Sequence, residues 1–381
     1  MELGLYIHYP YCLSKCPYCD FNSHVAKAID SNELVHSYVN ELSYYKNLVG
    51  DDITINTIFF GGGTPSLMDN NLISKLLDHI RSNYHLSDNI EITLEANPST
   101  IENNKIAFFH EIGINRISLG VQSFDEEVLK FLGRKHDVKT AVNALENIQK
   151  YFNNFSLDLI YGIHNQNLDD WKNNLKTAFS YNSNHISLYQ LTIEKGTEFF
   201  RRYNKNQLKV MNEDLQADLY DFTFYEAEKN GYNRYEISNF AKKGFESKHN
   251  LNYWQSGDYI GIGAGAHSRL TIKNKRYGFI NYHKPEKWSK SAMINNSIQS
   301  KELLSLETQI DEYIMMGLRL RKGININDFN TRFKVNFFEN INIKNYRILI
   351  NDDFLKFENN HVRITQKNLK LINNILSQLL S

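Results

Sequence analysis

Short runs of β-branched and aromatic residues alternate with segments of helical periodicity over the first half of the chain. The runs predict six strands, and apolar residues at three- and four-residue intervals predict five helices. The predicted strands are Leu3–His8, Thr57–Gly62, Ile90–Asn97, Arg116–Ser123, Phe155–Gly162 and His185–Thr192. The predicted helices are Asn32–Leu48, Asn70–Ser82, Ile101–Ile112, Asp137–Tyr151 and Leu168–Tyr181. This alternation indicates an α/β fold with a parallel sheet, and polar residues at the strand ends favour a partial (β/α)6 barrel.

The pattern changes after about residue 210. A helix is predicted at Glu213–Lys229, and the glycines of Gly261–Ser268 indicate close backbone packing near a pocket. Further helices are predicted at Ser305–Arg319, Asn327–Phe333 and Thr365–Leu380, with a hairpin that turns at Asn359-Asn360. These elements predict a small C-terminal helical, winged-helix-like domain. We therefore expect a barrel over residues 1–210, an extension over 211–295 and the C-terminal domain over 296–381.

The charge balance argues against two classes of partner. The chain has 43 basic and 43 acidic side chains, so its formal net charge is zero. Without a basic excess, nothing drives nucleic acid binding, and a structural or docking role is favoured for the winged-helix-like domain. No apolar run approaches the roughly 18 residues that span a bilayer, and the N-terminal residues do not resemble a secretory signal. We expect a cytoplasmic protein that contacts membranes only through a partner.

Three cysteines lie within eight residues, at Cys12, Cys16 and Cys19, and the chain has no others. They are too few and too close together to form a disulfide framework, so a shared ligand is the natural interpretation. Three thiolates can hold three irons of a [4Fe–4S] cluster and leave the fourth iron open. A zinc ion completed by His8, Asp20 or His24 remains the alternative.

Other motifs allow two interpretations each when taken alone. Gly61-Gly-Gly-Thr-Pro65 is either a tight turn or a loop whose backbone approaches a ligand. Glu95 and Asp158 lie in apolar strands, where a carboxylate is costly to bury without a partner, so they belong to ion pairs or contact a ligand. The imidazole of His249, with an aromatic pair close behind it, is either a haem ligand or a core residue.

The segment Tyr6–Phe21 resembles the cluster loop of the radical S-adenosylmethionine (SAM) superfamily, in the branch containing oxygen-independent coproporphyrinogen III oxidase. The similarity extends over nearly the whole chain. It implies that the three cysteines hold a [4Fe–4S] cluster whose open iron chelates SAM, and that one electron cleaves SAM to a 5′-deoxyadenosyl radical. The residues implied in binding the cofactors are Tyr6, Tyr18, Gly62, Gly63, Thr64, Glu95, Gln122, Arg134 and Asp158.

Two features distinguish between branches of this family. The oxidases usually have a further cysteine two residues after the third cluster cysteine, where this chain has Phe21, and a longer segment before the cluster. The hexapeptide His249-Asn-x-x-Tyr-Trp254 resembles the signature of the family's haem chaperones and implies that His249 binds haem. We therefore expect a chaperone that receives electrons from a reductant and delivers haem to haemoproteins such as respiratory enzymes. The alternative is a SAM-dependent oxidative decarboxylase of coproporphyrinogen III.

Overall fold

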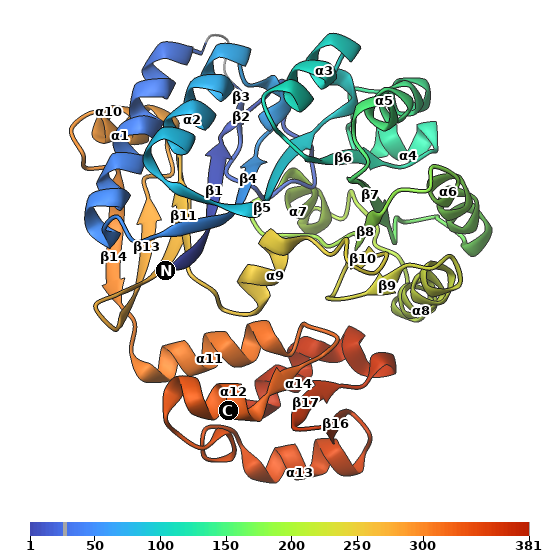
Figure 1. Ribbon diagram of the computed structural model, residues 1–381. Helices are drawn as coiled ribbons and strands as arrows, with labels where there is room; N and C mark the ends of the chain where they lie inside the picture. The colour runs from blue at the N-terminus through green and yellow to red at the C-terminus, as the bar shows by residue number, and fades with distance from the viewer. Residues whose placement is uncertain (26–28, 381) are drawn as a thin grey trace.

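The computed structural model describes residues 1–25 and 29–380. Its frame is a twelve-stranded sheet in the order β14-β13-β12-β11-β1-β4-β5-β6-β7-β8-β10-β9 (Figure 1). The six predicted strands are all present and pair in parallel. They are β1 (Glu2–Tyr9), β4 (Thr54–Gly62), β5 (His85–Ala96), β6 (Arg116–Gln122), β7 (Phe155–Tyr161) and β8 (His185–Gln190). The predicted parallel sheet is confirmed.

Helices cover the outer face of this sheet (Figure 1). They are α1 (Ser31–Val49), α2 (Asn70–Asn83), α3 (Asn103–Glu111), α4 (Glu126–Phe131), α5 (Val138–Tyr151), α6 (Leu168–Ser180) and α8 (Glu213–Lys229). The short α7 (Glu198–Asn204) packs instead against the loop after β1, where Phe199 N donates to the Pro17 carbonyl at 2.8 Å. The six helices predicted for this region agree closely with these bounds, whereas the short α4 and α7 were missed. Aspartates fix several of the starts: the Asp30 and Asp69 side chains accept hydrogen bonds from backbone N–H groups in the first turns of α1 and α2.

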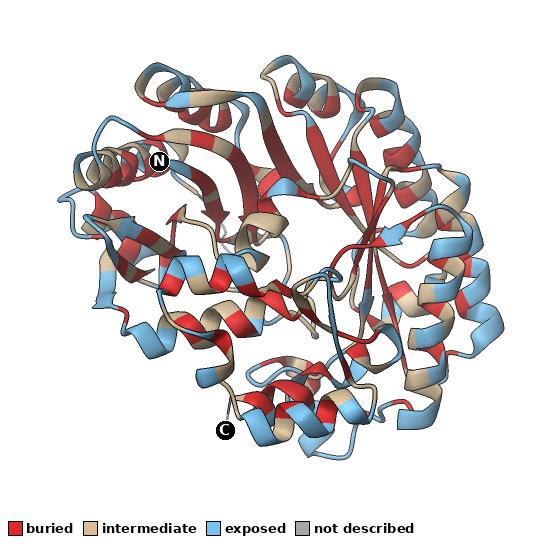
Figure 2. Ribbon diagram, turned by 60° about the horizontal axis from the view of Figure 1, so that its bottom comes forward, coloured by how far each residue is buried: buried red, intermediate tan, exposed pale blue. Residues whose placement is uncertain are grey.

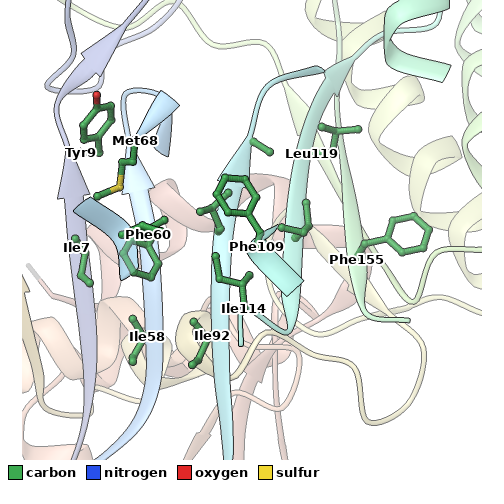
Figure 3. Close-up of a cluster of buried hydrophobic side chains, with 14 of the residues drawn as sticks. Ile7, Tyr9, Ile58, Phe60, Met68, Ile92, Phe109, Ile114, Leu119 and Phe155 are labelled. Carbon is green, nitrogen blue, oxygen red and sulfur yellow. The ribbon is translucent and has the colours of Figure 1, made fainter. Parts of the chain in front are cut away.

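The main core lies between the strands and these helices. Ile7, Ile58, Phe60, Ile92 and Leu119 of neighbouring strands pack there (Figure 3). Figure 2 shows buried residues along the strands and on the helix faces turned toward them. Because side chains alternate along a strand, the residues between these positions point to the concave inside of the barrel. That alternation leaves the polar residues of the strands facing the interior.

The chain after α8 adds strands to both edges of the same sheet. At one edge, β11 (Tyr259–Ile262) pairs parallel with β1, and β12 (His267–Ile272), β13 (Lys275–Asn281) and β14 (Ile298–Leu303) continue antiparallel. At the other edge are β10 (Asn239–Ala241) and β9 (Asn233–Arg234). The expected close packing of the glycine-rich segment is confirmed, because a Cβ on Gly263 would lie 2.3 Å from the His8 carbonyl oxygen.

A buried carboxylate ties these added strands to α1. Glu41 accepts hydrogen bonds from Gly263 N (2.8 Å), Asn281 Nδ2 (2.6 Å), Trp288 Nε1 (2.9 Å) and Ser297 Oγ (2.7 Å). Trp288 belongs to α10 (Pro285–Ala292). Burial raises the pKa of Glu41 to about 7, although each of these four hydrogen bonds lowers it. One side chain thus satisfies donors from four separate places in the chain that follows α8.

We expect Glu41→Ala to destabilise the protein strongly. The substitution leaves four buried donors without an acceptor, and each such group costs about 1 to 3 kcal/mol, so the free energy of unfolding should fall by roughly 3 kcal/mol or more. Urea unfolding followed by circular dichroism measures this change. Glu111→Ala, at an exposed position at the end of α3, is the control and should have little effect. Equal stability of the two variants would contradict a stabilising role for the hydrogen bonds that Glu41 accepts.

The C-terminal residues form a second buried cluster beside the barrel (Figure 1). It contains α11 (Leu306–Gly317), α12 (Ile326–Phe333), α13 (Ile343–Asn351), α14 (Ile372–Leu379) and a sheet of β15 (Ile324–Asn325), β17 (His361–Ile364) and β16 (Leu355–Glu358). The hairpin turn is confirmed, because Asn359 and Asn360 have φ of 49° and 63°. The final helix was predicted too long: Gln366–Leu371 is a 3₁₀ helix, and α13 was missed.

Helix α9 (Lys248–Trp254) lies between the sheet and this C-terminal domain (Figure 1). Its N-terminus rests on the Glu91 carboxylate of β5, which accepts hydrogen bonds from Lys248 N and His249 N, both at 3.2 Å. An acidic group there also complements the helix dipole. The hexapeptide that begins at His249 is therefore anchored to the barrel wall. In the part of the chain that the structure describes, no helix is both long and apolar enough to cross a membrane.

Candidate functional site

The carboxyl ends of the parallel strands surround a cavity of about 380 Å³. Most residues singled out by the sequence line this first cavity, although they lie far apart along the chain. They are Cys12, Cys16, Tyr18, Cys19, Gly62, Gly63, Thr64, Glu95, Gln122, Arg134 and Asp158. Tyr6 and His249 are not among the residues that line it. The rim of the barrel thus brings together three thiols, two carboxylates and a guanidinium.

The three thiols lie in the loop that follows β1, and none forms a disulfide. This loop is held by β2 (Tyr11–Cys12) and β3 (His24–Val25), which pair with each other. Thr64 Oγ1 donates to Cys12 Sγ at 3.3 Å, and Arg134 Nη1 donates to Cys16 Sγ at 3.6 Å. Burial raises the pKa of the Cys12 thiol, and the hydrogen bond from Thr64 offsets part of that rise. Three partly exposed thiols in such surroundings fit the donor set of a [4Fe–4S] cluster with one open iron.

The glycine turn at the end of β4 lies directly against the cysteine loop. Gly62 has φ of 113°, and a Cβ there would lie 2.7 Å from the His8 ring. A Cβ on Gly63 would lie 2.6 Å from the Tyr11 carbonyl oxygen and 3.0 Å from Cys12 Sγ. Side chains at these two positions would push the turn away from the thiols. The glycines are therefore required by close approach, not only by the turn itself.

Two carboxylates face the cavity from neighbouring parts of the sheet. Glu95 accepts a hydrogen bond from Gly62 N at 3.2 Å, and Asp158 accepts from Ser118 Oγ at 3.0 Å and from Ser156 Oγ at 3.2 Å. Burial, followed by the charge of Asp158, raises the pKa of Glu95 to about 8. Burial also raises the pKa of Asp158. A ligand that brings hydroxyl donors or a positive charge would stabilise both ionised forms.

Gln122 and Arg134 show two features that are typical of a ligand site: a strained backbone and a buried donor without an acceptor. Gln122 has φ of 67° at an irregularity in β6, and a Cβ on Gly120 would lie 2.7 Å from its Nε2. Left-handed backbone at a non-glycine residue is strained and concentrates at functional sites. Arg134 Nη2 donates to the Gly120 carbonyl at 3.0 Å, while its buried Nε has no acceptor among the described residues. Buried donors of this kind are usually satisfied by a ligand or water.

Sequence reasoning missed other residues that line this cavity, among them Ser118, Tyr189, Gln190 and Thr192. Gln190 ends β8, so the strand-end rule used for the other strands would have found it. Ser118 lies within β6, and its hydroxyl donates to the carboxylate of Asp158 on the neighbouring strand β7. Only the pairing of β6 with β7 reveals that contact.

Tyr6 lies behind the glycine turn and lines a second cavity, of about 790 Å³. Its hydroxyl is 3.0 Å from His8 Nδ1, and a Cβ on Gly61 would lie 2.8 Å from its ring. The two cavities adjoin, because both are lined by Lys15, Asp20, Phe21, Gly62 and Glu95. The predicted role of Tyr6 in cofactor binding stays a prediction.

His249 is enclosed and lines neither cavity; its side chain is 1% exposed. Its Nδ1 is 2.7 Å from Thr57 Oγ1, and its Nε2 is 2.7 Å from the Tyr253 hydroxyl. The ring stacks on Phe59 at a centroid distance of 5.0 Å, and burial lowers the pKa of His249 to about 3. The imidazole is therefore neutral, but haem coordination requires one nitrogen to give up its hydroxyl partner. Direct coordination by His249 stays a prediction.

Comparison with known proteins identifies the family. A family model described as Radical SAM superfamily matches residues 6–178, and one described as HemN C-terminal domain matches residues 304–369. The "Heme chaperone HemW" of Buchnera aphidicola subsp. Acyrthosiphon pisum is 38% identical over 98% of this chain and 97% of that protein. The chain belongs to the HemW family. The HemW proteins of Lactococcus lactis and Escherichia coli are 34% and 41% identical over 98% and 72% of this chain, and over 96% and 72% of their own lengths.

A solved structure confirms the fold of this HemW family member. The coproporphyrinogen III oxidase HemN of Escherichia coli superposes with a TM-score of 0.83 and covers 99% of this chain and 89% of its own. At 21% identity, this match shows the fold alone. The predicted radical SAM partial barrel with a C-terminal helical domain is therefore confirmed.

Membership of the radical SAM superfamily implies a [4Fe–4S] cluster and SAM. The region that matches the superfamily model, residues 6–178, contains all three cysteines and the predicted cofactor residues of the first cavity. The unsatisfied Arg134 Nε, the strained Gln122 and the cradle of glycines fit such a pair of cofactors. The cluster is therefore favoured over the zinc ion that the cysteines alone left open.

Proposed function

We propose that this protein is a haem chaperone that binds haem and delivers it to haemoproteins such as respiratory enzymes. The observation that carries the proposal is similarity to HemW chaperones over nearly the full length of the chain. Haemoprotein acceptors and a reducing electron donor are the partners that this role requires. Three free thiols close together favour a reducing compartment such as the cytoplasm. Contact with membranes would then come through the acceptor.

The predicted cofactor residues of the first cavity have distinct roles in this proposal. Cys12, Cys16 and Cys19 hold the cluster, which in its reduced state supplies an electron to SAM. The Gly62–Thr64 turn offers backbone atoms to the amino group of SAM, and Glu95 accepts hydrogen bonds from its ribose. Arg134 places a positive charge beside Cys16 and supports the thiolate.

Gln122 and Asp158 line the adenosine side in the same proposal, together with Tyr18 from the cysteine loop. Asp158 is held in place by the hydroxyls of Ser118 and Ser156, so its oxygens do not need to reorganise when a ligand arrives. The Tyr18 hydroxyl lies 3.4 Å from Arg134 Nη1, which joins this side to the cysteine loop.

The HemN-like fold supports one alternative, a SAM-dependent oxidative decarboxylase of coproporphyrinogen III. Phe21 argues against it. The oxidases that this family resembles usually have a cysteine at this position, whereas the Phe21 side chain here is 55% exposed and lines both cavities. A phenyl ring can pack against a ligand, but it provides neither a thiol nor a proton.

A paired assay separates the two functions. We expect the anaerobically reconstituted protein to bind haem at one per chain, seen as a saturating Soret band, and to transfer it to an apo-haemoprotein. Under reducing conditions with SAM, the same preparation should not convert coproporphyrinogen III to protoporphyrinogen IX, measured by chromatography of the oxidised porphyrins. Turnover of that substrate without haem transfer would replace the chaperone proposal with the decarboxylase.

A further inference from the structure

The second cavity is large and is built from three parts of the chain. Its wall includes Tyr6 of β1, Trp254 of α9, Arg269 of β12 and Met316 of α11. The sheet, α9 and the C-terminal domain therefore all contribute to it. A volume of about 790 Å³ is in the range of sites for sizeable organic ligands. Phe21, Gly62 and Glu95 line both cavities, so the two adjoin. A ligand in it would lie next to the cofactors.

Aromatic and sulfur-containing side chains give this cavity an apolar face. Tyr253, Trp254 and Tyr259 line it together with Phe21 and Met316. The rings of Tyr253 and Tyr259 pack edge to face at a centroid distance of 4.5 Å, so they form a fixed surface. Flat apolar ligands bury much area against such rings. Tyr253 and Trp254 are also the aromatic end of the hexapeptide that begins at His249.

Two histidines that sequence reasoning did not assign lie on the wall of the same cavity. His267 begins β12, His283 follows β13, and both are exposed. We call them the histidine pair. Neither imidazole has a hydrogen-bond partner among the described residues, in contrast to the two occupied nitrogens of His249. The pair therefore presents nitrogen atoms that are open to a ligand.

The backbone holds these two histidines near each other. Gly265 N donates to the Tyr282 carbonyl and Asn281 N donates to the Ala266 carbonyl, both at 2.9 Å. These bonds join the residues just before β12 to the residues at the end of β13. His283 Nδ1 lies 3.1 Å from the point that a Cβ on Gly265 would occupy. Asn22 Nδ2 donates to the His283 carbonyl at 2.9 Å and so fastens this wall to the cysteine loop. The pair is thus placed by the fold.

The charged groups around the pair are already largely balanced. Arg269 is paired with Glu312 at 2.8 Å and Arg276 with Asp258 at 2.6 Å, while Lys15 Nζ donates to carbonyl oxygens. Although His267 is exposed, partial desolvation by the surrounding cavity wall, followed by the charges of Arg269 and His283, lowers the pKa of His267. A neutral imidazole is the form that coordinates iron. Lys15 offers a cation within reach of an acidic ligand.

An apolar, planar, iron-containing ligand with carboxylate groups matches this combination. Resting on the proposed chaperone function, we propose that haem occupies the second cavity and that an imidazole of the histidine pair coordinates its iron. His249 is then a positioning residue, which acts through its hydrogen bond to the Tyr253 hydroxyl. Haem bound there would be in contact with the residues shared with the first cavity.

Ferric haem titration of the anaerobically reconstituted full-length protein tests this inference. Electron paramagnetic resonance and the Soret band report histidine ligation. The double variant His267→Ala/His283→Ala should change both spectra and weaken haem binding by roughly tenfold or more. Added imidazole should restore the wild-type spectrum in this variant, because it replaces the missing ligand. His36→Ala, on the exposed side of α1, is the matched control and should match wild type.

His249→Gln distinguishes the pair from the enclosed histidine, because an amide can keep hydrogen bonds to Thr57 and Tyr253. We expect it to retain the histidine-ligated spectrum. A double variant with the wild-type spectrum and affinity would overturn the inference, as would loss of ligation in His249→Gln alone. Wild-type protein that binds no haem would contradict the proposed function as well, whereas wild-type binding with an unaffected double variant contradicts only the inference.

Discussion

Cys16→Ser is expected to abolish the iron–sulfur chromophore. A cluster held by three thiolates loses a corner ligand, and a serine hydroxyl ionises far less readily than a thiol. Wild-type protein reconstituted under anaerobic conditions should contain about four irons per chain and show a broad visible absorption. The variant should lose the absorption and most of the iron. Iron analysis and visible spectroscopy measure both quantities.

Leu13→Ala is the control for this loop, because Leu13 is exposed and carries no ligand atom. It should keep the wild-type iron content. A wild-type chain that takes up one zinc ion and no iron would contradict the cluster assignment and restore the zinc alternative.

The second large effect is expected at Glu95, whose replacement by alanine should weaken SAM binding by roughly 10- to 100-fold. Hydrogen bonds to a charged group contribute about 1.5 to 3 kcal/mol, and the variant loses those from the ribose hydroxyls. The cluster should survive, because its ligands lie on a different loop. Isothermal titration of SAM, with iron content measured on the same samples, checks both statements. Unchanged affinity for SAM would remove Glu95 from the site.

The pH dependence gives this prediction a second measurement. Because burial raises the pKa of Glu95 to about 8, its carboxyl is mostly protonated at neutral pH in the free protein. Binding to the ribose hydroxyls uses the ionised form, so SAM affinity should rise as the pH increases through 8, with release of a proton. Glu95→Gln cannot ionise and should bind weakly with a flatter pH profile. Wild-type affinity that falls over this range would contradict the assignment.

The sequence by itself determined the alternating strands and helices of the barrel and, through the family resemblance, identified eleven of the residues that line the first cavity. Helical and strand periodicities are local, so α1 and β1 could be read from neighbouring residues. The spacing of Cys12, Cys16 and Cys19 is also local. Residues at the ends of parallel strands meet at one rim, which is why Glu95 and Asp158 could be expected together. Their roles in binding stay proposals.

Only the tertiary structure decided how the later segments join the barrel. The pairing of β11 with β1 links residues more than two hundred positions apart, and no local pattern encodes such a register. The same pairing brings His267 and His283 to the wall of the second cavity. It also brings four hydrogen-bond donors of the later segments to the Glu41 carboxylate. Short elements such as α13 depend on packing more than on propensity, so they were missed.

At His249, too, the sequence decided one property and the tertiary structure another. Its motif was visible in the sequence, where the residue types alone left both a haem ligand and a core residue open, and only the resemblance to haem chaperones favoured haem. Whether a ring nitrogen is open depends on which hydroxyls lie next to it. The Tyr253 hydroxyl comes from one turn further along α9, whereas Thr57 comes close only through the placement of α9 against β4. The sequence determines which residue stands at a position. Whether a ligand can reach that residue depends on the contacts that the fold creates around it.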